Sequence, residues 1–275
     1  MGDVIPLFPL GTPLFPGVVL PLQIFEPRYR RLMRDLLALP EAGAQRFFGV
    51  VAIRQGWEVE QVAPAEALYD IGCTARLQAV RPRPDGGFRI VTVGGDRFRL
   101  LDVLVRDEPP YLRAEVEWLA EEEAAEEAAG DHDGLVGLPG SGEEAGDGLD
   151  QIVFDVARGS MEVLGRGVGH LFTRYVAAVA GLRGDPDAEP EEAGGGPDTE
   201  ELLRSVDGDP RALSYLIASA ALLTTEDRQA LLAESATRRR LVAESRLLRR
   251  ELTMLETIGA VPVPVQRFAA PRSVN

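Results

Sequence analysis

Few side chains in this chain of 275 residues are of the types that carry out catalysis or bind metal, and those few stand apart. His132 and His170 are the two histidines, and neither has a second His or Cys at the spacing of a metal site. Ser141 lies in a Gly-Ser-Gly run without the strand and helix that flank a nucleophilic serine. The run from Gly165 to His170 has a histidine where a dinucleotide fingerprint has its third glycine, so we interpret it as a loop or helix hinge. We therefore predict no catalytic residue, no metal site and no cofactor.

The basic residues point the same way, because all 29 are arginine and lysine is absent. A Walker A motif needs a lysine on the nucleotide phosphates, and a Ser-Lys peptidase dyad needs an amine that loses its proton at neutral pH, which arginine cannot do. We therefore expect that the chain is not an enzyme of either kind. Genome base composition explains the missing lysine more simply than a functional need for guanidinium groups does.

The elements that must position any site begin with a proline-rich segment, which has six prolines among Ile, Leu, Val and Phe. Each proline fixes φ and lacks an N–H, so we expect short edge strands and tight turns. Pro16-Gly17 predicts a type II turn, and Pro27 begins a helix with an apolar stripe from Tyr29 to Leu37. Strands are predicted at 47–54, 69–81, 88–93, 97–105 and 112–119, with positive-φ glycine turns at 84–87 and 94–96. This number of strands suggests a closed or nearly closed barrel.

Five segments, in this order along the chain, closely resemble the Lon N-terminal (substrate-binding) domain family. They are Pro6-Leu7-Phe8-Pro9-Leu10, Leu14-Phe15-Pro16-Gly17, Leu20-Pro21-Leu22-Gln23-Ile24-Phe25-Glu26-Pro27-Arg28-Tyr29, Leu68-Tyr69-Asp70-Ile71-Gly72-Cys73 and Val91-Thr92-Val93-Gly94-Gly95-Asp96-Arg97-Phe98-Arg99. The region from Asp209 to Leu255 is similar to the helical part that follows in the family. The resemblance implies an α+β fold: a PUA-like, mainly antiparallel β pseudo-barrel with one early helix, followed by an all-α helical domain. It also implies a stand-alone member without the ATPase and peptidase domains, since the chain stops at Asn275.

The resemblance implies a polypeptide-binding or adaptor module that recognises unfolded or degron-bearing segments through apolar surface, with a protease or chaperone as a further partner. The hypothetical binding residues are Phe8, Phe15, Phe25 and Tyr29, if they face solvent. Two alternatives remain open: an RNA-binding PUA-like protein, or a structural partner subunit of a protease complex. The arginines that would contact RNA are Arg76, Arg81, Arg83, Arg89, Arg97 and Arg99. Residues 1–113 carry 14 arginines against 13 acidic residues, which disfavours nucleic acid.

Charge is unevenly distributed, because residues 114–150 carry 13 acidic residues and no arginine. The net charge of −15 therefore comes mainly from Gly- and Glu-rich stretches, which we interpret as linkers. The predicted domains are a β domain at 1–119, an acidic flexible linker at 120–150, a helical domain at 151–258 with an acidic loop at 184–208, and a C-terminal tail at 259–275.

Within the helical domain, helices are predicted at 152–164 and 171–182, with another that begins at Asp209-Pro210. A longer helix is expected from Thr225 toward Ile258, with Arg238–Arg240 on a solvated face. Its seven-residue repeat consists of Leu241, Leu248 and Leu255, with Leu252 between them. We expect this stripe to pack within its own chain rather than in a dimeric coiled coil.

The single cysteine, Cys73, lies in an apolar strand pattern and is expected to be a buried, inert thiol. There is no signal-peptide pattern and no apolar run of membrane-spanning length. We therefore predict a cytoplasmic protein without a membrane partner.

Overall fold

The computed structural model describes residues 2–40, 46–54, 66–120, 146–183 and 199–258. The chain divides into two compact units, called here the β unit (Met1–Ala120 and Thr225–Ser235) and the helical unit (Glu121–Thr224 and Ala236–Asn275). The stretch Thr225–Ser235 was expected in the helical domain, but it belongs to the β unit. The chain therefore leaves the β unit, forms most of the helical unit, and returns before the last helix.

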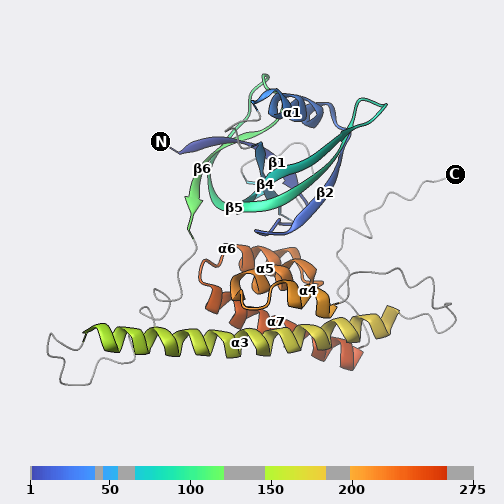
Figure 1. Cartoon of the computed structure of the whole chain (residues 1–275). Helices are drawn as coiled ribbons and strands as arrows, with labels where there is room; N and C mark the ends of the chain where they lie inside the picture. Colours follow the sequence, from blue (N-terminus) through green and yellow to red (C-terminus); the bar gives the residue numbers. More distant parts are fainter. Residues whose placement is uncertain (1, 41–45, 55–65, 121–145, 184–198, 259–275) are drawn as a thin grey trace. The chain divides into compact units, whose positions relative to one another are not determined.

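Six strands form one mainly antiparallel sheet that closes on itself (Figure 1). They are β1 (Asp3–Leu10), β2 (Val19–Ile24), β3 (Phe47–Ile53), β4 (Leu68–Pro82), β5 (Phe88–Leu104) and β6 (Arg113–Leu119). Their order is β2-β5-β4-β3-β1-β6, and a further pairing of β5 with β6 joins five of them into a ring. The pairing of β1 with β3 is parallel and the others are antiparallel. The predicted PUA-like pseudo-barrel is confirmed.

β1 contains two prolines although it lies between β3 and β6 in the sheet. Residues 3–6 pair with β6, whereas residues 7–10 pair with β3. In the described pairings each half of β1 therefore has a strand on one side, which is the edge position that tolerates a missing N–H. The prediction of short edge strands is confirmed for β2, which lies at the edge of the sheet, whereas β1 is an internal strand that changes its partner halfway.

β5 is a single strand of 17 residues where the sequence predicted two strands and a turn. Gly94 and Gly95 lie inside it, and neither has a positive φ. Gly94 instead permits a close approach, because a Cβ atom at this position would overlap the carbonyl oxygen of Phe15. The predicted positive-φ turns are confirmed at Gly17 (φ 75°) and Gly86 (φ 77°).

The early helix α1 (Pro27–Ala38) begins at the predicted proline, whose fixed φ suits the first helical turn. Its buried side chains are Tyr29, Leu32, Met33 and Leu36, which follow the predicted stripe. This amphipathic pattern holds α1 against the β unit, and the prediction is confirmed.

The helical unit contains α3 (Gly146–Arg183), α4 (Thr199–Ser205), α5 (Pro210–Ala220) and α7 (Thr237–Ile258). α3 and α7 lie side by side, and α5 packs against both (Figure 1). No described helix is long and apolar enough to cross a membrane. α3 begins within the predicted linker, and α4 lies within the predicted loop.

The predicted hinge at Gly165, Gly167 and Gly169 is wrong, because α3 continues through all three. A glycine in a helix interior costs roughly 1 kcal/mol relative to alanine. The buried side chains of Val168 and Phe172 lie on the same helix, and their burial offsets that cost.

The predicted long helix is in fact two helices, α6 (Thr225–Ala233) in the β unit and α7 in the helical unit. Arg97 of β5 explains the break. Its Nη1 donates to the carbonyl oxygens of Leu232 (2.8 Å) and Glu234 (3.2 Å), which a continuing helix would use for its own hydrogen bonds. In α7 the four stripe leucines are buried and face α3 and α5, so the predicted packing within the chain is confirmed.

Candidate binding surface

The four aromatic residues that the sequence analysis proposed for binding differ in their solvent exposure. Phe8, Phe15 and Tyr29 are buried, whereas the side chain of Phe25 is 65% exposed. Phe8 stacks on Tyr29 with ring centroids 4.1 Å apart, and burial raises the pKa of the Tyr29 hydroxyl. The first three rings are therefore part of the β unit's core, and the binding hypothesis can rest on Phe25 alone among the four.

Phe25 continues an exposed strip along β2. Val19, Pro21 and Gln23 are also exposed, with Val19 at 58%, while Ile24 is buried. Side chains of a strand alternate between its two faces, so Val19, Pro21 and Gln23 share the outer face, and Phe25 follows directly after the strand. We call Val19, Pro21, Gln23 and Phe25 the β2 strip. It is apolar apart from Gln23, whose side-chain oxygen accepts a hydrogen bond from Arg83 Nη1 at 3.0 Å.

The register of β2, β5 and β4 extends this strip into a broader surface, called here the outer face. Its three rows of paired residues are Gln23–Arg89–Arg81, Pro21–Val91–Ala79 and Val19–Val93–Arg76. Val91 and Val93 are half-buried and the other seven residues are exposed. The barrel side of β5 is occupied by the fully buried Ile90 and Thr92. The outer face is thus a solvent-facing sheet surface with an apolar middle and arginines at both ends.

The open edge of β2 is protected against pairing with another strand. The Gly94 N–H donates to the Val18 carbonyl at 2.9 Å, which places the even-numbered residues of β2 in the hydrogen-bonded pairs with β5. The odd-numbered residues therefore direct their backbone groups toward the open edge. Pro21, at the middle of that edge, has no N–H to offer. A ligand is consequently better held by the side chains of the outer face than by strand addition.

The arginines expected to contact RNA do not form one patch. Arg97 is 2% exposed, and its guanidinium donates to backbone carbonyls of β6's end and of the α6 segment. Arg99 pairs with Glu117 at 3.0 Å, and Arg83 pairs with Asp85 at 3.4 Å. Arg76, Arg81 and Arg89 remain, all on the outer face.

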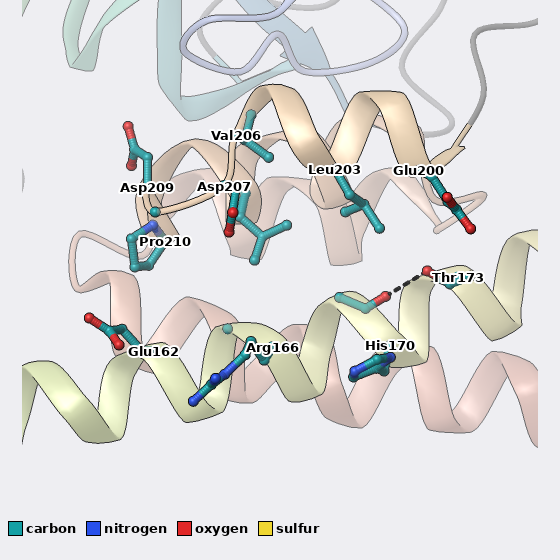
Figure 2. Close-up of a pocket in the computed structure, with 14 residues that line it drawn as sticks. Glu162, Arg166, His170, Thr173, Glu200, Leu203, Val206, Asp207, Asp209 and Pro210 are labelled. Atoms are coloured by element: carbon teal, nitrogen blue, oxygen red, sulfur yellow. Dashed lines mark hydrogen bonds between the residues drawn. The ribbon is translucent and has the colours of Figure 1, made fainter.

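A cavity of about 650 Å³ lies in the helical unit between α3, α4 and the turn before α5 (Figure 2). Glu162, Arg166 and His170 line it from successive turns of α3, and Leu203 and Val206 line it from the opposite side. All five side chains are exposed or half-buried, so the cavity is open to solvent.

Two of the acidic side chains that line the cavity are engaged in local contacts. Asp209 accepts the Ala212 N–H at 2.9 Å as the cap of α5, and Glu200 pairs with Arg204 at 2.9 Å. Within the described parts of the chain, no three His, Cys, Asp or Glu residues could hold a metal ion. The run from Gly165 to His170 is helix interior, where the backbone amides are already bonded and cannot cradle a phosphate. His132 and Ser141 lie outside the described residues.

The predicted inert thiol is confirmed. Cys73 is buried, and desolvation raises the pKa of its thiol to about 12. Because the thiolate is the reactive form, this cysteine is not a nucleophile at neutral pH.

Sequence reasoning missed a buried polar cluster in the helical unit. Arg240 is fully buried: its Nε donates to Ser214 Oγ at 2.8 Å, and its guanidinium lies 4.1 Å from the centre of the Tyr215 ring. Ser214 donates to Glu244 at 2.7 Å, and burial raises the pKa of Glu244 to about 8. The expected solvated face is therefore wrong at Arg240. Glu244 lies three and four residues from stripe leucines, a spacing that already indicated burial.

The closed sheet and the helices that follow it define a PUA-like β unit joined to a helical unit. The family model described as the ATP-dependent protease La (LON) substrate-binding domain matches residues 4–250, and the chain belongs to this family. The family assigns the chain to the class of substrate-recognition modules.

Relatives in bacteria include Lon protease 1 of Herpetosiphon aurantiacus, which is 27% identical over 271 residues, or 96% of this chain and 26% of that protein. The Lon protease of Parabacteroides distasonis is 32% identical over 117 residues, or 42% of this chain and 13% of that protein. The crystal structure of a Lon N-terminal domain protein from Xanthomonas campestris matches with a TM-score of 0.48 and 20% identity, covering 90% of this chain and 98% of that one. The chain spans 26% or less of the length of these two curated relatives.

Proposed function

We propose that the chain is a non-enzymatic module that binds unfolded or degron-bearing polypeptides through the β2 strip. The observation that supports this most directly is the exposure of Val19 at the start of the open-edged strand β2 and of Phe25 directly after its end. Large apolar side chains that share one exposed face are a common feature of protein-binding surfaces.

The strip offers useful binding free energy to an extended apolar segment. Full burial of a Phe or Val side chain contributes about 1.5–3 kcal/mol. Since Phe25 is 65% exposed, covering it recovers about 1–2 kcal/mol, and covering Val19 adds about 1 kcal/mol. These two contacts supply about 2–3 kcal/mol of the roughly 8 kcal/mol that micromolar binding requires, so contacts with other residues of the outer face must supply the rest and offset the cost of ordering the peptide.

Delivery of the bound segment to a protease or chaperone would make the module an adaptor. The buried, unpaired Cys73 suits a reducing compartment, which supports a cytoplasmic site of action. A structural subunit of a protease complex would not bind free peptides, whereas an adaptor would. Peptide binding therefore distinguishes the two roles.

The test measures fluorescence anisotropy of a labelled, unfolded apolar peptide titrated with the full chain. Val19→Asp should weaken binding at least about tenfold, because it places a charge against the apolar ligand. Val105→Asp is the matched control, since Val105 is 63% exposed in the same unit but lies away from β2. Equal affinity of the two variants, with unchanged Tm, would contradict the proposal. Tighter binding of single-stranded RNA at physiological salt would contradict it as well.

A further inference from the structure

The outer face combines apolar and cationic side chains in a fixed order. Its middle row is Pro21, Val91 and Ala79, which carry no charge, and the rows on either side end in arginines. Within the described residues, Arg76, Arg81 and Arg89 form no ion pair. A ligand that lies on this face therefore meets positive charge at both ends and apolar surface between them.

One end of the face carries two like charges in direct opposition. Arg81 of β4 and Arg89 of β5 are register partners, and both are exposed. Like charges directly opposite each other destabilise an antiparallel pair. An anionic group between the two guanidinium groups would offset that repulsion, which an apolar ligand alone would leave in place.

The spacing of the two ends fits an extended chain. Arg89 and Val93, the β5 partners of Arg81 and Arg76, are four residues apart, or about 13 Å along a strand. An extended peptide has the same rise, and its alternate side chains point to one side. Ligand positions i and i+4 would therefore meet the two ends while position i+2 meets the apolar middle.

We infer that the outer face selects extended polypeptide segments in which two acidic residues, four positions apart, flank an apolar residue. This inference rests on the proposed function and specifies the class of its substrate. The ligand lies on the side-chain face of β2, β5 and β4, because Pro21 blocks regular pairing at the open edge. Attraction between the arginines at the two ends of the face and the acidic residues of the ligand gives the selectivity. The apolar middle row contributes to affinity for any extended segment with an apolar residue at that position.

A nucleic acid fits this face less well than an acidic peptide. A single strand carries a charge at each nucleotide and would place phosphates over Val91 and Ala79 as well as over the arginines. Two further arginines of the β unit are already engaged: Arg97 donates to backbone carbonyls and Arg99 donates to Glu117. The charge pattern therefore favours a peptide whose carboxylates are separated.

The experiment compares labelled peptides of equal length with the full chain, by anisotropy at low and at physiological salt. The core sequences are Glu-Ser-Val-Ser-Glu, its glutamine and lysine counterparts, and a spacing control, Glu-Glu-Val-Ser-Ser. The first should bind about tenfold more tightly than the lysine peptide and several-fold more tightly than the spacing control, with differences that shrink as salt rises.

The variants Arg89→Gln and Arg76→Gln should each reduce the preference for the acidic peptide about threefold while binding of the glutamine peptide is unchanged. Arg34→Gln, on the exposed surface of α1, is the matched control and should leave the preference intact. Urea unfolding of each variant verifies that the barrel is preserved.

Three results would overturn the inference. If all four peptides bind equally, the charge selectivity is refuted while the proposed polypeptide-binding function stands. If none binds, both fail. If oligouridylate binds more tightly than the acidic peptide and loses affinity in Arg89→Gln, the face recognises phosphates and the peptide assignment is wrong.

Discussion

The substitution Arg97→Lys keeps the positive charge of a buried side chain but replaces its planar, forked guanidinium group with an ammonium group. We expect this change to destabilise the β unit. In the native protein the guanidinium donates from Nη1 to Leu232 (2.8 Å) and Glu234 (3.2 Å), and from Nη2 to Ala120 (3.2 Å). These bonds tie β5 to the end of β6 and to the segment that returns from the helical unit.

The expected magnitude follows from the bonds that lysine cannot make. A single ammonium can serve the two carbonyls near Nη1, but the bond to Ala120 is lost, which costs about 1.5–3 kcal/mol for a charged donor. Lysine is also more strongly hydrated than arginine, so its burial adds to the cost. We expect a loss of about 2–4 kcal/mol, equivalent to a fall in Tm of roughly 10 °C for a unit of this size.

The assay is urea unfolding of the full chain together with amide hydrogen exchange. Residues 225–235 should lose protection in Arg97→Lys, because their carbonyl anchors weaken. Arg99→Lys is the matched control: Arg99 is two residues away on β5, is about half exposed, and should change stability by less than about 0.5 kcal/mol. Equal stability of the two variants would refute the reasoning that the fork is required.

Three further changes test the packing of both units. Gly94→Ala should cost at least about 3 kcal/mol in thermal unfolding because its Cβ would overlap backbone, whereas Gly167→Ala, in open space on α3, should stabilise by roughly 1 kcal/mol. Burial raises the pKa of Glu244 to about 8, so between about pH 5 and pH 8 this carboxyl group is ionised in the unfolded chain but still protonated in the folded one. The free energy of unfolding should therefore fall as pH rises through this range, by at most about 1.4 kcal/mol per pH unit. Urea unfolding of Glu244→Gln should lack this pH dependence. Leu248→Ala should cost about 2–5 kcal/mol in urea unfolding, and the exposed Met254→Ala less than about 0.5 kcal/mol.

Local patterns in the sequence predicted most of the barrel. The turn at Gly17, the turn at Gly86 and the start of α1 at Pro27 each depend on chemistry that neighbouring residues supply, and all three are confirmed. Gly94 was misassigned because its role depends on contact with Phe15, a residue far away in the sequence. The break between α6 and α7 was missed for the same reason, since it depends on Arg97 of the β unit.

The candidate site was only partly predictable. The sequence identified the β2 segment, but a proline-rich apolar run does not reveal which rings face inward, and three of the four aromatics belong to the core. The arginines of the outer face were recognised as candidates, yet their separation into exposed and buried groups depends on strand register. Register joins Arg89 to Arg81 and Gln23 across three strands, and no local pattern encodes that pairing.

The structure also changes the interpretation of a chain without lysine. At Arg97 the fork reaches three carbonyls, and at Arg240 the plane lies over Tyr215 while its nitrogens donate to Ser214 and Thr237. A compact ammonium cannot reproduce either arrangement. Base composition therefore remains a sufficient explanation for exposed positions such as Arg34, whereas at Arg97 and Arg240 the guanidinium geometry holds the native packing, and we expect lysine there to destabilise the protein.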